Sequence, residues 1–172
     1  MSGSPPSSRG IGIRQATVAL TDAQVKTLPT AGVTLVAAPA AGQVLIPVLA
    51  VARLAWVADY TNINAAAILS VASLGPTTLA PLNEADISGV SGLLAAGDTA
   101  SALFTPNLII PASATDTLGA SNSGFGDSVL ASALVLSADN AGGGNFTGGN
   151  AGNALRVTVA YYVLTLASGI LS

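Results

Sequence analysis

The longest apolar run of the chain extends from Gln43 to Tyr60 (QVLIPVLAVARLAWVADY). Its richness in Val, Ile and Leu predicts a long buried strand, or two strands bent at Pro47. Side chains of a strand point alternately to opposite faces, and here both alternating sets are mostly apolar, broken only by Pro47 and Arg53. One face can fill the core of the protein's own sheet, so the other needs cover from a second sheet or a neighbouring subunit.

Shorter apolar or alternating segments predict further strands. They are Arg14 to Leu20, Val33 to Ala37, Ala65 to Ala72, Ser101 to Thr105, Leu108 to Pro111, Asp127 to Ala138 and Ala154 to Ala167. Alanine in the third of these also fits a helix, and we favour the strand. The last has an unbroken apolar face, made by Leu155, Val157, Val159, Tyr161 and Val163. Strands joined by turns rich in Pro, Gly and Asn predict an all-β fold, an antiparallel β-sandwich or jelly roll with long loops.

Helical signals are limited to single turns. Thr21 to Gln24 has the pattern of a capping box, which predicts one turn through Lys26. Asn83, followed by Glu84 and Asp86, predicts a second short helix.

The polar segments at the start and near the end of the chain lack apolar residues to bury. Met1 to Gly10 predicts a flexible arm, which is either plain disorder or a segment that docks on a neighbouring subunit. Asp139 to Asn153 is almost all Gly and Asn, and it predicts a mobile surface loop that buries too little to order itself. Residues 11–172 are then a single β-sandwich domain.

The composition changes this picture, because the surface lacks charge. Hydrophobic residues make up 51% of the 172 residues and charged residues only 8%, against about 25% in a typical soluble domain. We therefore expect other protein chains to cover much of the surface. The net charge of −3 and the scattered basic residues argue against nucleic acid as a partner. Pro39, Pro47 and Arg53 interrupt the one stretch long enough to span a membrane. The polar N-terminus lacks the core of a signal peptide, so we expect assembly in a cytoplasm.

Candidate chemistry is sparse. Without Cys or His, the chain has no thiolate and lacks the commonest general base and metal ligand. No Ser stands three residues before Lys26, and no Gly-Lys-Ser/Thr follows the glycines of 142–149. A calcium ion held by Asp127 or Asp139 is the remaining metal alternative, although calcium needs six or more oxygens. We expect no catalytic residue, cofactor, metal or small-molecule substrate, and therefore no enzyme.

Five residues are candidates for a protein interface: Arg53, Trp56, Tyr60, Arg156 and Tyr162. Each arginine interrupts an apolar strand face, so it either reaches water at a strand end or forms an ion pair across a subunit contact, with Asp59 or Asp139 as partner. Aromatic side chains are enriched in interfaces, although Trp56 fits the core equally well.

Lys26 to Trp56 carries a Leu-Pro-Thr stretch, a strand, a Pro/Ala/Gly turn and a long apolar strand, and Leu155 to Leu166 (LRVTVAYYVLTL) ends the sheet with paired tyrosines. In this pattern the two segments resemble small virion proteins of tailed bacteriophages. Together they cover about a third of the chain. The resemblance implies a β-sandwich or jelly-roll protein of the particle, a capsid decoration (cement) protein or head fibre, often trimeric and without catalytic residues.

The resemblance and the composition give one main functional expectation and two alternatives. We expect a homo-oligomer, most simply a trimer, on the capsid exterior of the virion, where it stabilises contacts between major capsid protein subunits. The first alternative is a tail, baseplate or fibre component that binds a host surface through the loop Asp139 to Asn153. The second is a lectin-like jelly roll, for which the chain has few aromatic residues.

Overall fold

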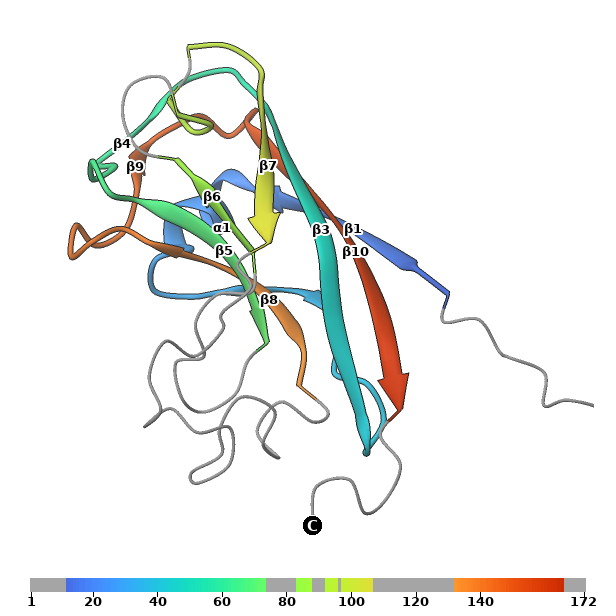
Figure 1. Cartoon of the computed structure of the whole chain (residues 1–172). Coiled ribbons are helices and arrows are strands. Elements are labelled where there is room, and N and C mark those ends of the chain that lie inside the picture. Colours follow the sequence, from blue (N-terminus) through green and yellow to red (C-terminus); the bar gives the residue numbers. More distant parts are fainter. Residues whose placement is uncertain (1–11, 74–82, 88–91, 96, 107–131, 166–172) are drawn as a thin grey trace, which may run out of the picture.

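A computed structural model of the chain describes residues 12–73, 83–87, 92–95, 97–106 and 132–165 (Figure 1). Its elements are β1 (Arg14–Thr21), α1 (Asp22–Thr27), β2 (Val33–Val36), β3 (Gln43–Ala55), β4 (Tyr60–Thr61), β5 (Ile68–Ser73), β6 (Asn83–Asp86), β7 (Ala100–Pro106), β8 (Leu134–Asp139), β9 (Thr147–Gly148) and β10 (Ala154–Thr165). The predicted arm 1–10, the predicted strand 108–111 and residues 127–131 lie outside the described residues.

The strands form an antiparallel, sandwich-like structure, which confirms the all-β prediction. Eight of them make one continuous sheet in the order β1-β10-β3-β7-β6-β5-β8-β2, and β4 pairs with β9 separately. The sheet turns at β7, which pairs with β3 through residues 100–104 and with β6 through residues 105–106. The two ends of the order, β1 and β2, come close to each other, so the sheet encloses a core.

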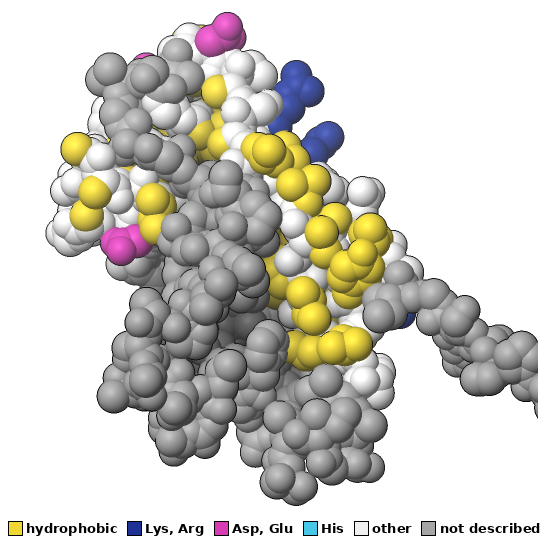
Figure 2. All heavy atoms as spheres, viewed as in Figure 1, with side chains coloured by type: hydrophobic (Ala, Val, Ile, Leu, Met, Phe, Trp, Pro, Cys, Tyr) yellow, Lys and Arg dark blue, Asp and Glu magenta, His cyan; other side chains and the backbone are white. Residues whose placement is uncertain are grey.

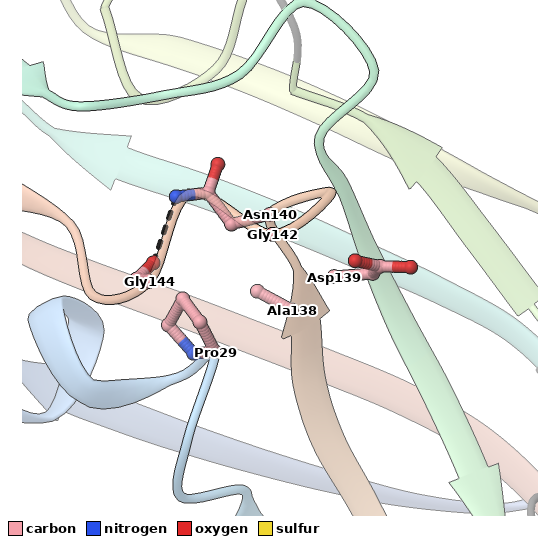
Figure 3. Close-up of a pocket in the computed structure, with 6 residues that line it drawn as sticks. All are labelled: Pro29, Ala138, Asp139, Asn140, Gly142 and Gly144. Atoms are coloured by element: carbon pink, nitrogen blue, oxygen red, sulfur yellow. Dashed lines mark hydrogen bonds between the residues drawn. The ribbon is translucent and has the colours of Figure 1, made fainter.

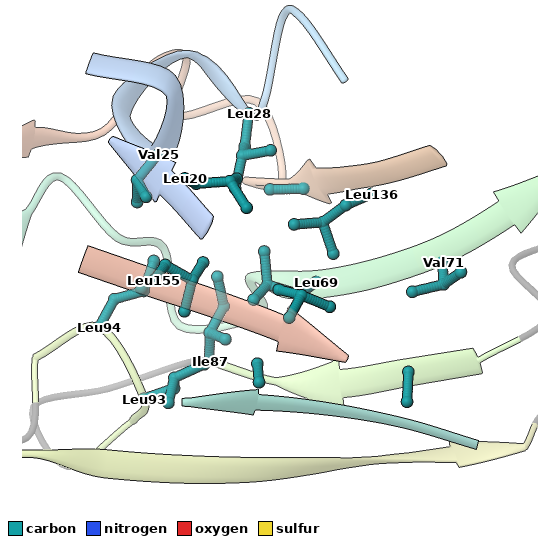
Figure 4. Close-up of a cluster of buried hydrophobic side chains, with 14 of the residues drawn as sticks. Leu20, Val25, Leu28, Leu69, Val71, Ile87, Leu93, Leu94, Leu136 and Leu155 are labelled. Carbon is teal, nitrogen blue, oxygen red and sulfur yellow. The ribbon is translucent and has the colours of Figure 1, made fainter. Parts of the chain in front are cut away.

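The core lies between the two halves of this sheet and takes side chains from both (Figure 4). Leu54, Leu155 and Val157 enter from one half, and Leu69 and Leu136 enter from the other. The helix α1 adds Val25 and its C-cap residue adds Leu28, and both side chains are fully buried. The apolar face predicted for the last strand is confirmed, because its members Leu155 to Val159 at alternate positions are buried.

The helix α1 joins β1 to β2, and it begins as predicted. Thr21 accepts a hydrogen bond from Gln24 N, and Gln24 Oε1 in turn accepts one from Thr21 N at 3.0 Å, which completes the capping box. The helix ends at Thr27, with Leu28 as its C-cap residue, before Pro29. Capping satisfies backbone donors that have no partner within the helix, so a single turn is stable here.

The long apolar run forms one strand, β3, with a bulge next to Pro47. Across β10, Leu49 pairs with Ala160 and Pro47 pairs with Tyr161, so Val48 has no partner residue on that strand. The pairing of β3 with β7 covers only Ala50–Leu54, so Pro47 lies where β3 has one described neighbour. Proline occurs in sheets at bulges and edges because it has no backbone N–H to donate.

The short helix predicted at Asn83 is wrong, because residues 83–86 form the strand β6. Asn83 to Asp86 pair with Val71 to Ile68 of β5, and Asn83 and Glu84 pair with Pro106 and Thr105 of β7. Asn and acidic residues favour a helix start only weakly, by capping and dipole effects. Pairing on both sides of the strand overrides that local preference.

The prediction that Asp139 to Asn153 buries too little to order itself is also wrong. Asn140 is buried, and its Nδ2 donates to Asn62 O and Gly144 O, each at 2.8 Å. Phe146 lies in the core cluster with 2% of its surface exposed. The segment contains β9, which pairs with β4. The buried side chains of Asn140, Asn153 and Phe146 therefore fix a loop that consists mostly of glycine and asparagine.

Candidate functional site

Four carboxylates, those of Asp22, Asp59, Asp98 and Asp139, each have a structural role. Asp22 forms an ion pair with Lys26 at 2.7 Å, and Asp59 Oδ1 accepts from Trp56 Nε1 at 2.7 Å. Asp98 and Asp139 accept hydrogen bonds from the backbone N–H of Thr99 and Ala141. Among the described residues, no group of three His, Cys, Asp or Glu side chains could hold a metal ion.

A surface recess lies between the α1–β2 connection and the segment after β8 (Figure 3). It is lined by Pro29, Ala138, Asp139, Asn140, Gly142 and Gly144. The Asp139 carboxylate points away from Pro29 and Gly144, and Asn140 Nδ2 is bound to Gly144 O. The recess therefore lacks the set of convergent polar side chains that a small-molecule site needs.

The most distinctive surface is the solvent side of the strands β1, β10, β3 and β7, which we call the outer face. The register places Val51 of β3 between Thr158 of β10 and Leu103 of β7, and it places Leu49 opposite Ala160. Leu103, Leu49 and Val51 are 60%, 41% and 37% exposed. Figure 2 shows hydrophobic side chains extending along this side of the molecule, over β3 and β10. Large apolar side chains gathered on one exposed face mark an interaction surface.

The outer face is not uniform along the strands. Toward the start of β3, Ile46 and Tyr162 form a register pair and are both half-buried, and Val44 is buried. Toward the other end, Ser101 and Ala19 lie beside two arginines. The exposed apolar part is thus bounded by half-buried residues at one end and by positive charge at the other.

The two arginines are Arg53 and Arg156, and the antiparallel register places them directly opposite each other. Both are exposed. Among the described residues the one ion pair is Lys26–Asp22, so neither arginine is paired with Asp59 or Asp139 of the same chain. The ion pair expected across a subunit contact stays a prediction. Side chains directly opposite on neighbouring strands lie about 5 Å apart at Cβ, and like charges there repel each other.

The other three predicted interface residues lie in different places. Tyr162 belongs to the outer face and is half-buried. Trp56 packs against the core, and its Nε1 donates to Asp59 Oδ1. Tyr60 is 1% exposed, so its side chain is not available to a partner, and we leave it out of the surface.

Burial changes the acidity of Tyr60. Removal from water raises the pKa of Tyr60 to about 12, because burial disfavours the phenolate. The nearby Asp22 carboxylate also raises the pKa, and the hydroxyl of Tyr60 has no hydrogen-bond partner among the described residues. Gly149 lies against this group, with φ +68°, and a Cβ there would stand 2.6 Å from both Asp22 Oδ1 and Tyr60 Cε1. Tyr60 therefore belongs to the core and lies next to Asp22 of α1 and Gly149.

Several structural residues escaped the sequence interpretation. Leu49 and Val51 were part of the apolar run, but only the register assigns them to the exposed side with Leu103. Asn153 accepts from Val57 N and Ala58 N through Oδ1 and donates to Ala58 O, so it joins the end of β3 to the start of β10. An Asn next to a strand is the one available signal, and it is shared by many ordinary turns.

Comparison with known proteins assigns no function to the outer face. No protein-family model, curated protein or solved structure matches the chain. Within the described residues, no helix has the length and apolar character needed to cross a membrane. Any functional assignment therefore depends on the outer face and on the sequence resemblance.

Proposed function

We propose that the chain is a non-enzymatic virion structural protein of a tailed bacteriophage, a capsid decoration protein that acts through protein–protein contacts. The observation that carries the proposal is the outer face, with Leu49, Val51 and Leu103 exposed on one sheet. A protein with only 8% charged residues has little else to keep such a face in solution. The sequence resemblance supplies the phage context.

In this proposal the outer face packs against a sister copy in a trimer, and the assembled copies contact the major capsid protein on the outside of the head. Burial of apolar area stabilises such contacts by about 25 cal/mol per Å² before association costs are subtracted. A stable interface buries about 800 Å² on each partner. We also propose that the sandwich-like fold is a jelly roll.

The decisive experiment compares particles that contain the protein with particles that lack it. Heads without the protein should release their DNA at a lower temperature or after a milder osmotic shock, and added purified protein should restore resistance. Leu103→Asp places a charge on the outer face and should restore less resistance than wild type. The matched control, Thr34→Asp, adds the same charge at an exposed residue of β2, in the other half of the sheet. Equal resistance with and without the protein would refute the proposal.

One observation favours the alternative of a tail, baseplate or fibre component. The segment 139–153 is anchored by Asn140, Phe146 and Asn153, yet residues Ala141, Gly142 and Asn150 are exposed. A fixed polar loop is suited to recognition. Electron microscopy of virions labelled through an added tag would separate the two functions, because the label would lie on the tail in one case and on the head in the other.

A further inference from the structure

The paired arginines of the outer face have no opposite charge within reach in the described part of the chain. Arg53 and Arg156 are exposed, and their strand neighbours on the same face are Ser101 and Ala19. The pair is destabilising in an isolated chain, because like charges stand directly opposite each other. An anion bound between the two guanidinium groups would remove this repulsion, and each group can bind a carboxylate in a bidentate manner.

We infer that Arg53 and Arg156 together bind a carboxylate of a second copy of this chain, and that the outer face of one copy docks on a different surface of the next. This inference rests on the homo-oligomer in the proposed function. The two arginines lie beside exposed Leu49, Val51 and Leu103, so the anion is part of a surface that also buries apolar groups. A protein partner can supply both a carboxylate for the arginines and apolar side chains for the surface beside them.

Charge complementarity identifies the second copy as the occupant. The chain has a net charge of −3, and without the two arginines its remaining three basic and eight acidic residues give −5. The rest of the protein is therefore acidic, whereas the charges placed on the described outer face are both positive. Surfaces of opposite sign favour association and set its orientation.

The same charges exclude a face-to-face pairing. In a two-fold contact the same patch meets itself, so a contact centred on the arginines would bring four positive charges together. Contact between two different surfaces avoids this repulsion. Such head-to-tail contacts form a closed ring when the rotation between copies closes, and the proposed trimer is one such ring.

Three described acidic residues fit the role of acceptor. Asp59, Asp98 and Asp139 are exposed, and each uses Oδ1 for hydrogen bonds within the chain. No hydrogen bond between described residues engages their Oδ2 atoms. Asp22 differs, because its Oδ2 is bound by Lys26 Nζ at 2.7 Å.

Phosphate groups of nucleic acid are a weaker fit. A duplex is bound by several basic residues that follow its backbone, and affinity rises with the number of phosphates neutralised. Here two arginines lie at one end of an apolar surface, in a chain of net negative charge. The pair matches one carboxylate rather than a run of phosphates.

The first test measures assembly in solution. The double variant Arg53→Gln, Arg156→Gln should weaken self-association about 10- to 100-fold, as loss of a charged hydrogen-bonded pair does at other interfaces. The control Arg14→Gln also removes positive charge, from an exposed residue at the start of β1, and should assemble like wild type. Sedimentation in 50 and 500 mM NaCl should show salt-sensitive assembly for wild type and not for the double variant.

The second test identifies the acceptor. In the background Arg53→Glu, Arg156→Glu, each of the eight acidic residues is changed to Lys, starting with Asp59, Asp98 and Asp139. The change that restores assembly identifies the acceptor, and circular dichroism checks that each variant is folded. Restoration by none of the eight would overturn the inference.

Other outcomes separate this inference from the proposed function. Assembly of the double Gln variant at wild-type affinity, or a wild-type chain that stays monomeric, would overturn the inference. Binding of a double-stranded DNA oligonucleotide that is lost in the double Gln variant would assign the pair to phosphate and overturn it too. If the double Gln variant assembles at wild-type affinity and still binds and stabilises phage heads, the inference fails and the proposed function holds.

Discussion

The two sides of β3 differ in what faces them, although both are apolar. Ala50, Ala52 and Leu54 point into the core and are fully buried. Leu49 and Val51 stand between them in sequence and point to the outer face, where they are exposed. Hydrophobicity thus indicates which residues can be buried, and the second layer of the fold decides which ones are. The outer face of β3, which is apolar but has no second sheet of described residues packed on it, is therefore the candidate surface for a partner.

The largest effect is expected from shortening one leucine on each side of β3. Leu54→Ala removes a fully buried side chain and should lower the free energy of unfolding by about 2–5 kcal/mol. Leu49→Ala should change that of the isolated chain by about 0.5 kcal/mol or less, because its side chain is already exposed. Urea unfolding at concentrations that keep the chain monomeric measures both, and equal losses would invalidate the comparison.

The next effect concerns Asn153, which holds the ends of the same two strands together. Asn153→Ala leaves Val57 N, Ala58 N and Ala58 O without this partner, and it should lower the free energy of unfolding by about 2 kcal/mol. Asn150→Ala is the matched control, since Asn150 is exposed and its side chain accepts a hydrogen bond from Gly152 N alone among the described residues. A similar loss in both variants would show that the buried asparagine has no special role. Urea unfolding also measures this pair.

The pH dependence separates a buried tyrosine from one on the outer face. The pKa of Tyr60 is raised from 10.0 to about 12, so the folded state holds the proton more tightly than the unfolded state. Its contribution, on the order of 2 kcal/mol, is fully present below pH 10 and is lost as the pH rises toward 12.

Unfolding by urea between pH 8 and pH 11.5 tests this contribution. Tyr60→Phe should be less sensitive to alkaline pH than wild type. Tyr162→Phe should keep the wild-type fall, because Tyr60 is still present. Parallel curves for wild type and Tyr60→Phe would contradict the buried position of this phenol.

The smallest effect concerns the arginines when no partner is present. Arg53→Gln relieves the repulsion with Arg156 and should raise the free energy of unfolding of the monomer by about 0.2–0.5 kcal/mol in low salt. The gain should diminish in 0.5 M NaCl, because salt screens exposed charges. Arg14→Gln provides the comparison, and a gain equal to that of Arg53→Gln would indicate a general charge effect. Differential scanning calorimetry at both salt concentrations resolves such shifts.

Local patterns predicted most of the strands and the start of α1. The run from Gln43, the alternation after Ala154 and the capping box at Thr21 each depend on neighbours in sequence, and each prediction was confirmed. The helix expected at Asn83 failed because its fate depends on β5 and β7, which are distant in sequence. The Gly- and Asn-rich segment was misjudged for the same reason, since the partners of Asn140 lie partly in residues 62–64.

The candidate surface was predictable in its parts and not in its arrangement. The sequence predicts Arg53 and Arg156 as interface residues because each interrupts an apolar face. Their contact across β3 and β10 joins positions about a hundred residues apart, and only the register fixes it. Leu103 reaches the same surface through a third strand. Composition indicated that a partner is needed, whereas pairing between distant strands determines where it binds.

The single extra residue at Val48 shifts the alternation within β3. Leu45 and Ala50 both belong to the core cluster although five positions separate them, an odd spacing that a regular strand would send to opposite sides. The first half of the strand is thus one step out of phase with the second. Insertion or deletion of one residue in either half would move the side chains of that half to the opposite face of the sheet and leave those of the other half in place. The lengths of the two halves are therefore fixed independently.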